Sequence, residues 1–314
     1  MPARPFAALL LATAAGLAAS LAVAAAPDLS TPEDQLLAMR RIQCSETDGK
    51  PMTFYWKGTA YSRVPGEPDR QLFKVEGMNV RQCGPLAGSK NKAEFRLVSR
   101  EILLYEDPVT GEVLRNWTNP WTGKTVEVLH VANDPVNGNY GLMGRDGKPT
   151  NLPFEVIGNQ WWLTTAVPLF YTNVLAGDYQ RYVGGTYHVT ELFNFFGAAD
   201  DLANRKRDTA DTAVGWQRIS MWLPWMEMGD RAGLLYFHTA GRKLDQWDDL
   251  SPTMQAEIGK NFPAYRNPPP LDDQRPNETS WTYFKKLIDA RKPAPYERVH
   301  ARPVHAAERS RPHA

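Results

Sequence analysis

Extended segments rich in β-branched and aromatic residues follow one another along most of this 314-residue chain, with short runs of turn residues between them. They lie at residues 53–64, 71–83, 94–106, 112–121, 125–133, 154–174, 179–196, 215–228 and 233–241. At residues 107–111 the turn chemistry is explicit, since Pro108 fixes φ and Gly111 accepts a positive φ. The pattern predicts a mainly β fold, an antiparallel meander that closes into a barrel or a strongly bent sheet, because closure removes unpaired edges.

Helical patterns flank this β region. Ser30 or Thr31 is a suitable N-cap for a short helix that has Pro32 in its first turn and ends near Arg41. Residues 251–262 and 278–292 also begin with capping residues, so we expect two or three helices near the C-terminal end. Because no linker-like stretch separates residues 42 and 245, we expect a single β-rich ligand-binding or catalytic domain over residues 25–290.

The two ends of the chain differ from this domain. Residues 1–24 combine Arg4, an apolar run and small residues near a cleavage site, which predicts a secretory signal peptide; a membrane anchor is the alternative. We therefore expect a periplasmic or secreted protein with no transmembrane segment after cleavage. Residues 291–314 hold six Lys/Arg and four Pro, which predicts a disordered basic tail, either solvated or bound to an anionic lipid or partner.

Charge argues against one class of partner. The whole chain has 36 Lys/Arg and 35 Asp/Glu, but the region between the predicted signal and tail has 29 and 33, a net charge of −4. An acidic domain disfavours nucleic acid as a partner. The sequence does not indicate an oligomeric state.

Cys44 and Cys83 are the two cysteines of the chain. In an oxidising compartment they are expected to form a disulfide, which would stabilise the fold by about 3 to 4 kcal/mol in the chain-entropy model. Two buried free thiols are the alternative. No C-x-x-C spacing is present, so neither a thioredoxin-like site nor a cysteine zinc site is supported.

The motifs of serine esterases, zincins, phosphate-binding loops, dinucleotide-binding loops and c-type haem sites are missing. We therefore expect no cofactor and no metal. His130, His188 and His238 lie inside apolar strand segments, and Asp134 follows four residues after His130. On inward faces these four residues would converge as a general acid and base. The alternatives are separate core histidines, or a metal site completed by Asp134 or Glu191.

Aromatic and methionine side chains cluster in several segments, which suits a cavity for a large apolar ligand, although core filling alone also explains most of them. The candidate ligand-binding residues are Trp117, Asn119, Trp121, Trp162, Trp222, Trp225, Met226, Tyr236 and Arg231. For Arg231 the alternative is a solvated rim.

Several segments resemble the domain-of-unknown-function family 1838, notably N-P-W-T-G at 119–123, H-V-A-N-D-P-V at 130–136 and P-W-M-x-M-G at 224–229. The resemblance covers about residues 38 to 250 and implies a single domain. It directs attention to Asn119, Trp121, His130, Asp134, Trp225, Met226 and His238, but supplies no roles. A looser likeness, in strand pattern alone, is to lipocalin-like barrels that bind or convert hydrophobic ligands.

Three functions remain open on this basis. The leading hypothesis is an exported enzyme that uses acid/base catalysis, without a nucleotide cofactor, on a hydrophobic or aromatic small molecule, in the lyase, hydratase or isomerase range. The first alternative is a non-catalytic periplasmic carrier of a lipophilic ligand, in which the histidines point away from the cavity or pair with the backbone. The second alternative is a metal-dependent hydrolase.

Overall fold

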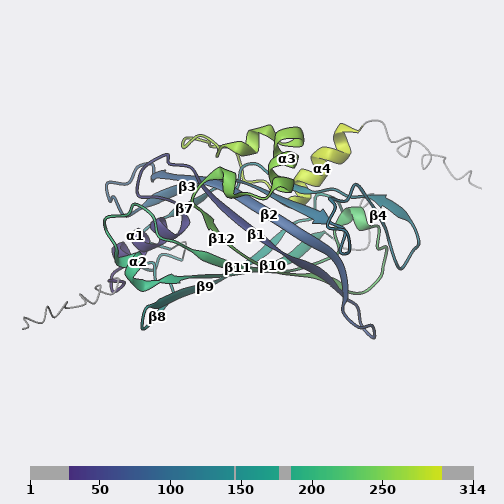
Figure 1. The fold of residues 1–314 in the computed structure, drawn as a ribbon, viewed down its shortest axis with the longest axis horizontal. Coiled ribbons are helices and arrows are strands. Elements are labelled where there is room, and N and C mark those ends of the chain that lie inside the picture. The colour runs from purple at the N-terminus through teal and green to yellow at the C-terminus, as the bar shows by residue number, and fades with distance from the viewer. Residues whose placement is uncertain (1–27, 145, 177–184, 292–314) are drawn as a thin grey trace, which may run out of the picture.

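A computed structural model describes residues 28–144, 146–176 and 185–291 of the chain (Figure 1). Its long strands are β1 (Met52–Arg63), β2 (Arg70–Pro85), β3 (Phe95–Glu106), β9 (Gln160–Thr172), β10 (Thr186–Ala198), β11 (Ala213–Ser220) and β12 (Leu234–Leu244). The short ones are β4 (Asn116–Thr118), β5 (Thr125–Glu127), β6 (Val131–Asn133), β7 (Gly138–Tyr140) and β8 (Phe154–Ile157). The predicted signal peptide and residues 292–314 of the predicted tail lie outside the described residues.

Ten of these strands form one antiparallel sheet in the order β6-β3-β2-β1-β12-β11-β10-β9-β8, with β7 also paired to β3. Strands β4 and β5 form a separate pair. The prediction of a mainly β, antiparallel fold is confirmed. The prediction of a closed barrel is wrong, since the edge strands β6 and β8 do not pair with each other in the described part of the chain, and the sheet curls less strongly than expected. Both edges are very short strands, which limits the exposed edge without closure.

Two glycines allow the central strands β1 and β12 to approach closely. A Cβ atom at Gly58 of β1 would lie 2.6 Å from the Cα of Thr239, and a Cβ at Gly241 of β12 would lie 2.5 Å from the Cα of Trp56. No residue other than glycine fits at such distances. In Figure 1 the β1–β3 half of the sheet lies above the β9–β11 half, on either side of this central pair.

The predicted strand boundaries differ from the structure where side chains or prolines interrupt the ladder. The predicted strand over residues 112–121 is reduced to β4, because the Asn119 side chain accepts hydrogen bonds from the backbone N–H groups of Trp121 (2.9 Å) and Thr122 (3.2 Å) and closes a turn. The predicted strand over residues 215–228 ends at Ser220, and a 3₁₀ turn follows at Pro224–Met226. The hairpin turn at residues 107–111 is confirmed, with Gly111 at φ 76°.

Four α-helices complete the described part of the chain: α1 (Pro32–Gln43), α2 (Ala199–Ala203), α3 (Pro252–Asn261) and α4 (Ser280–Ala290). The side chain of Thr31 caps α1 by accepting from the N–H of Asp34, as the capping pattern predicts. Helix α2 is not predicted by the sequence pattern. Within the part of the chain that the structure covers, no helix is long and apolar enough to cross a membrane.

The helices divide between the two faces of the sheet. Met254 and Ile258 of α3 pack on Met78 and Ile102, which lie on the outer face of β2 and β3. Helix α1 instead packs at one end of the inner face, where Ile42 joins a core cluster with several strand residues. Helix α4 covers the other end of that face, and Trp281 stacks on Tyr187 of β10 with ring centroids 4.4 Å apart.

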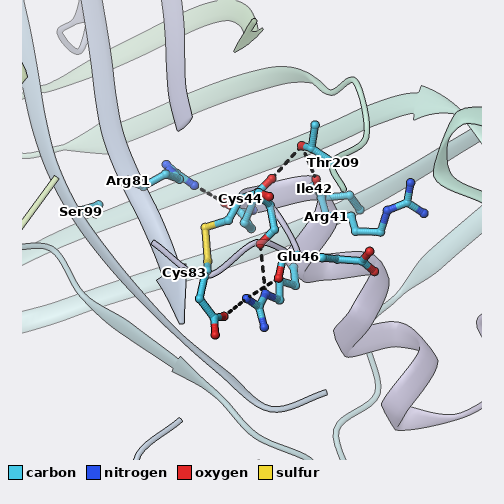
Figure 2. Close-up of a disulfide and its surroundings, with 12 residues drawn as sticks. Arg41, Ile42, Cys44, Glu46, Arg81, Cys83, Ser99 and Thr209 are labelled. Carbon is cyan, nitrogen blue, oxygen red and sulfur yellow. Dashed lines mark hydrogen bonds and ion pairs between the residues drawn. A yellow bond between two sulfur atoms is a disulfide. The ribbon is translucent and has the colours of Figure 1, made fainter. Parts of the chain in front are cut away.

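The predicted disulfide is confirmed. Cys44, the C-cap of α1, is bonded to Cys83 of β2, with Cα atoms 5.9 Å apart and a sequence separation of 39 (Figure 2). Cys83 lies two residues after Arg81 on the same face of β2, and Cys44 directly follows Gln43. The bond therefore anchors the end of α1 to the strand that carries Arg81.

Candidate functional site: a pocket on the inner face of the sheet

A pocket of about 440 Å³ lies on the inner face of the sheet, between residues of α1 and the N-terminal end of α4. Strands β1, β2, β3 and β6 form one wall, and β9, β10 and β11 form the other. Its volume falls in the range of about 300 to 1,000 Å³ that is common for small-molecule sites.

Most of the pocket surface is apolar. Aromatic and aliphatic side chains come from both walls: Phe54, Trp56, Leu97, Leu103, Val131, Tyr140, Val167, Leu169, Tyr171, Tyr187, Phe193, Phe195, Val214 and Trp216. Such a lining suits the aromatic or aliphatic body of a ligand.

One ion pair belongs to the β10–β11 wall. Arg218 donates from NH1 to Oε1 of Glu191 at 2.9 Å, and their side chains are 11 % and 18 % exposed. Burial raises the pKa of the Glu191 carboxyl, the charge of Arg218 lowers it, and the charge of Glu101 raises it. Because Glu101 comes from β3, two carboxyl groups on opposite walls influence each other across the pocket.

The β2–β3 wall carries the other polar groups. Glu101 accepts a hydrogen bond from the Asn133 amide at 2.7 Å, and Asn79 donates to the Ser99 hydroxyl at 3.3 Å. The Oδ1 atom of Asn133 is buried without a hydrogen-bond partner in the described structure, and so is the indole nitrogen of Trp56. Unpaired buried polar groups on pocket residues are available to a ligand.

Arg81 is the second arginine of the pocket. Its Nε donates to Oδ1 of Asn79 at 2.8 Å, its NH1 donates to Oε1 of Gln43, and its guanidinium lies 4.5 Å from the ring centroid of Phe54. Burial lowers the pKa of Arg81 to about 10, which still leaves the side chain charged at neutral pH. Figure 2 shows Arg81 beside the disulfide that ties α1 to β2.

A second hollow of about 510 Å³ adjoins the pocket at Asn137, Gly138 and Asn277. Its two arginines are already engaged, since Arg275 is paired with Asp273 and Arg96 donates to a backbone carbonyl. The inner-face pocket, with its apolar lining and its buried charges, is the better candidate site.

Of the histidines predicted to be catalytic, His130 is buried in the core and is not among the residues that line the pocket. His188 and His238 are exposed, so the expectation that they face inward is wrong for both. Each lies on the outward-facing side of its strand. His188 lies between the buried residues Tyr187 and Val189, and His238 lies between the buried residues Phe237 and Thr239. Two strands and about four residues separate them on the outer face, on the order of 16 Å. The structure therefore does not bring the three histidines together.

Asp134, the fourth predicted catalytic residue, does not pair with His130 among the described residues. Its carboxylate lies 3.0 Å from Nε of Arg100 and 2.7 Å from NH2 of Arg275. Two arginines thus satisfy this side chain, which lies outside the lining of the pocket.

None of the nine predicted ligand-binding residues is among the described residues that line the pocket: Trp117, Asn119, Trp121, Trp162, Trp222, Trp225, Met226, Tyr236 and Arg231. Trp117 and Trp225 pack in the core with their ring centroids 6.1 Å apart. Asn119 donates to the carbonyl of Met226 at 2.8 Å. Their contacts are with one another rather than with the pocket.

Four of the remaining predicted ligand residues, Trp121, Arg231, Tyr236 and Trp222, also have protein partners. The indole of Trp121 donates to Glu67 at 2.9 Å, and Arg231 lies over the Trp121 ring and pairs with Glu67. Tyr236 stacks on Tyr61 on the outer face. The Trp222 indole donates to the Arg231 carbonyl at 3.0 Å.

The sequence analysis missed Arg81, Glu101 and Arg218, and named Glu191 solely as a possible metal ligand. A signal for them exists in strand parity. Each of the four charged residues lies an even number of positions from an inward-facing apolar residue of its strand and therefore faces the same side. The pairs are Arg81 with Val75, Glu101 with Leu103, Arg218 with Trp216, and Glu191 with Phe193. A charged residue at a core-facing position of a predicted strand marks this pocket better than histidine does.

No group of three or more His, Cys, Asp or Glu within residues 28–144, 146–176 and 185–291 is arranged to hold a metal ion. The metal-dependent hydrolase alternative stays a prediction.

Residues 49–288 match the family model described as a protein of unknown function (DUF1838). Because the match covers most of the chain, the protein belongs to this family, as the resemblance of its motifs predicts. No curated protein matches the sequence.

Proposed function

We propose that this member of the DUF1838 family binds a small molecule with an apolar or aromatic body in the inner-face pocket, as a carrier does. The observation that carries the proposal is the lining itself. Apolar side chains from both halves of the sheet enclose a few convergent, partly buried polar groups, among them Arg81, Glu101, Glu191 and Arg218. This is the common composition of small-molecule sites.

The positions of the histidines favour a carrier over the histidine-based enzyme. A carrier is expected to have histidines that point away from its cavity or pair with the backbone. His188 and His238 are exposed on the outer face, and Nδ1 of His130 accepts from the backbone N–H of Tyr105 at 3.1 Å.

The test is binding of a neutral fluorescent probe, N-phenyl-1-naphthylamine, and its loss when the pocket is filled. Val167 lines the pocket, so Val167→Trp should lower probe affinity by about tenfold or more because the indole occupies the cavity. Val156 has the same exposure, 38 %, and lies outside the lining. Val156→Trp is therefore the matched control. Equal binding by both variants, or no binding by the wild type, would overturn the proposal.

A second candidate function is acid/base catalysis in the same pocket by Glu191. The supporting observation is a carboxyl group with a raised pKa, paired to Arg218 and opposed by a second carboxyl, Glu101, on the facing wall. The molecule that copurifies with the protein, identified by mass spectrometry, would be followed for conversion. Glu191→Gln should stop conversion and retain binding, whereas the control Glu155→Gln, at an exposed residue of β8, should leave both conversion and binding unchanged.

We also infer that the protein is exported. The composition of residues 1–24 supports a signal peptide, and the Cys44–Cys83 disulfide is of the kind that persists in an oxidising compartment. Cell fractionation and N-terminal sequencing test this inference. A mature chain that begins near residue 25 in the periplasm or the medium is the expected result, and an intact chain in the cytoplasm would contradict it.

A further inference from the structure

We propose that the ligand of the inner-face pocket carries an anionic group of the carboxylate or sulfonate kind, and that Arg81 binds this group. The inference rests on the proposed function, because it assigns the chemical class of the ligand for that same pocket. It begins with the hydrogen bonds and charges around the two pocket arginines.

The guanidinium of Arg81 is held in place by neutral groups. Asn79 and Gln43 each accept one of its N–H donors through a side-chain oxygen, and Phe54 supports its face at 4.5 Å. The hydrogen bonds of Arg81 in the described structure come from Nε and Nη1, and its Nη2 atom has no partner there. A guanidinium fixed on one edge and free on the other is arranged for a planar anion, because its donors match the spacing of carboxylate oxygens.

The charge of Arg81 is not neutralised by an ion pair in the described part of the chain. Arg218, the other pocket arginine, already has Glu191 at 2.9 Å. Glu101 is opposite Asn79 in the β2–β3 register, while Arg81 is opposite Ser99, so Glu101 is a diagonal neighbour beyond ion-pair distance. The charge of Glu101 favours the charged form of Arg81 at this longer range, but it forms no ion pair with it. A partly buried cation without a direct ion pair is unfavourable, and an anionic ligand would supply one.

The position of Arg81 also orients the ligand. It lies at the end of the pocket near α1, close to Phe54, Gln43 and Tyr140, whereas Tyr187 and Leu169 line the part near α4. An anionic group bound to Arg81 leaves the apolar body to extend along Trp56 and Trp216. Glu191 and Arg218 then face the body of the ligand and not its charged end.

The test compares two probes with nearly the same aromatic body. N-phenyl-1-naphthylamine is neutral, and 1-anilinonaphthalene-8-sulfonate adds one sulfonate. The wild-type protein should bind the sulfonate about tenfold or more tightly than the neutral probe, because a charge-assisted contact to Arg81 forms in a largely desolvated pocket. Arg81→Gln should remove this preference and leave the affinity for the neutral probe within about twofold.

Two further variants control the test. Arg70 lies on the same strand, is exposed, and stacks on Trp121, so Arg70→Gln should leave both affinities unchanged. Arg81→Lys keeps a cation but loses the planar fork, so part of the preference should remain. Arg81→Lys also tests the proposal if Arg81→Gln fails to fold. The proposal would be overturned if Arg81→Gln kept the wild-type preference for the sulfonate probe, or if the wild-type protein showed no such preference.

The outcomes separate this inference from the proposed function. If neither probe binds, or if Val167→Trp does not weaken the binding, the pocket is not a binding site and both proposals fail. If the neutral probe binds in the pocket and the sulfonate gains nothing, the proposed function stands and the anionic ligand class is rejected.

Discussion

His130 accepts a hydrogen bond at its Nδ1 atom from the backbone N–H of Tyr105, at 3.1 Å, inside the core between β3 and the segment that leads into β6. Burial, together with the charge of Arg115, lowers the pKa of His130 to about 4, against the opposing charge of Glu257. The ring is therefore neutral near pH 7 and serves as a fixed acceptor.

His130→Ala should destabilise the protein by about 2 to 4 kcal/mol, because it leaves a cavity and an unpaired N–H on Tyr105. The exposed His238 offers the comparison, and His238→Ala should change the free energy of unfolding by about 0.5 kcal/mol or less. Urea denaturation measures both. A His130→Ala protein with wild-type stability would show that this hydrogen bond contributes little.

Lys243 ties β12 to the C-terminal end of α1. Its Nζ donates to the carbonyls of Arg41 (2.7 Å) and Ile42 (3.0 Å) and to the hydroxyl of Thr209 (2.7 Å). Lys243→Met should cost about 2 to 3 kcal/mol, since it removes three buried hydrogen bonds from a charged donor at a helix end. Arg242→Met, at the neighbouring exposed residue, is the control. Similar losses of thermal stability in the two variants would contradict the assigned role.

The pH dependence of stability should report on Glu106. Burial, and its neighbour Glu76, raise the pKa of Glu106 to about 7 from an ordinary value of 4.5. The folded state then holds this proton more tightly than the unfolded chain, so the contribution of Glu106 to stability is greatest below about pH 4.5 and is lost as pH rises through 7.

Glu106→Gln should flatten that fall, which amounts to at most about 3 kcal/mol. The measurement is the free energy of unfolding in urea at several values between pH 5 and 8. Glu112→Gln, at an exposed glutamate nearby in the sequence, should keep the wild-type slope. If Glu106→Gln also keeps it, another group is responsible.

Removal of the disulfide should lower the free energy of unfolding by about 4 kcal/mol, the chain-entropy value for a loop of this length. A Cys44→Ser, Cys83→Ser double variant and the wild type under reducing conditions should agree in thermal denaturation. A double variant as stable as the oxidised protein would show that the cross-link adds no net stability.

Sequence patterns predict the local elements well because turn residues and strand alternation are short-range signals. Thr31 as N-cap and Gly111 at its turn are examples. Closure of the sheet was not predictable in the same way. Closure depends on whether two strands far apart in the sequence pair at the edges of the sheet. Strands β6 and β8 are too short to be identified as edge strands from the sequence pattern.

The candidate site was less predictable than the fold. The sequence-based hypotheses chose histidines as catalytic residues and tryptophans as ligand-binding residues because of their residue type. In the structure, His238 faces outward and Trp225 packs in the core. Arg81 and Glu191 come from strands more than a hundred residues apart. Their convergence is a property of strand order, which a single sequence does not display.

The disulfide makes the geometry of the pocket depend on whether Cys44 and Cys83 have been oxidised. Cys44 follows Gln43, which orients Arg81, and Cys83 follows Arg81 by two residues, so one covalent bond fixes both partners of that contact (Figure 2). Before oxidation, the end of α1 is tethered to β2 by weaker contacts alone. If the protein is exported and the pocket binds an anion, as proposed above, the newly made chain would reach its full affinity for that ligand after the thiols are oxidised outside the cytoplasm.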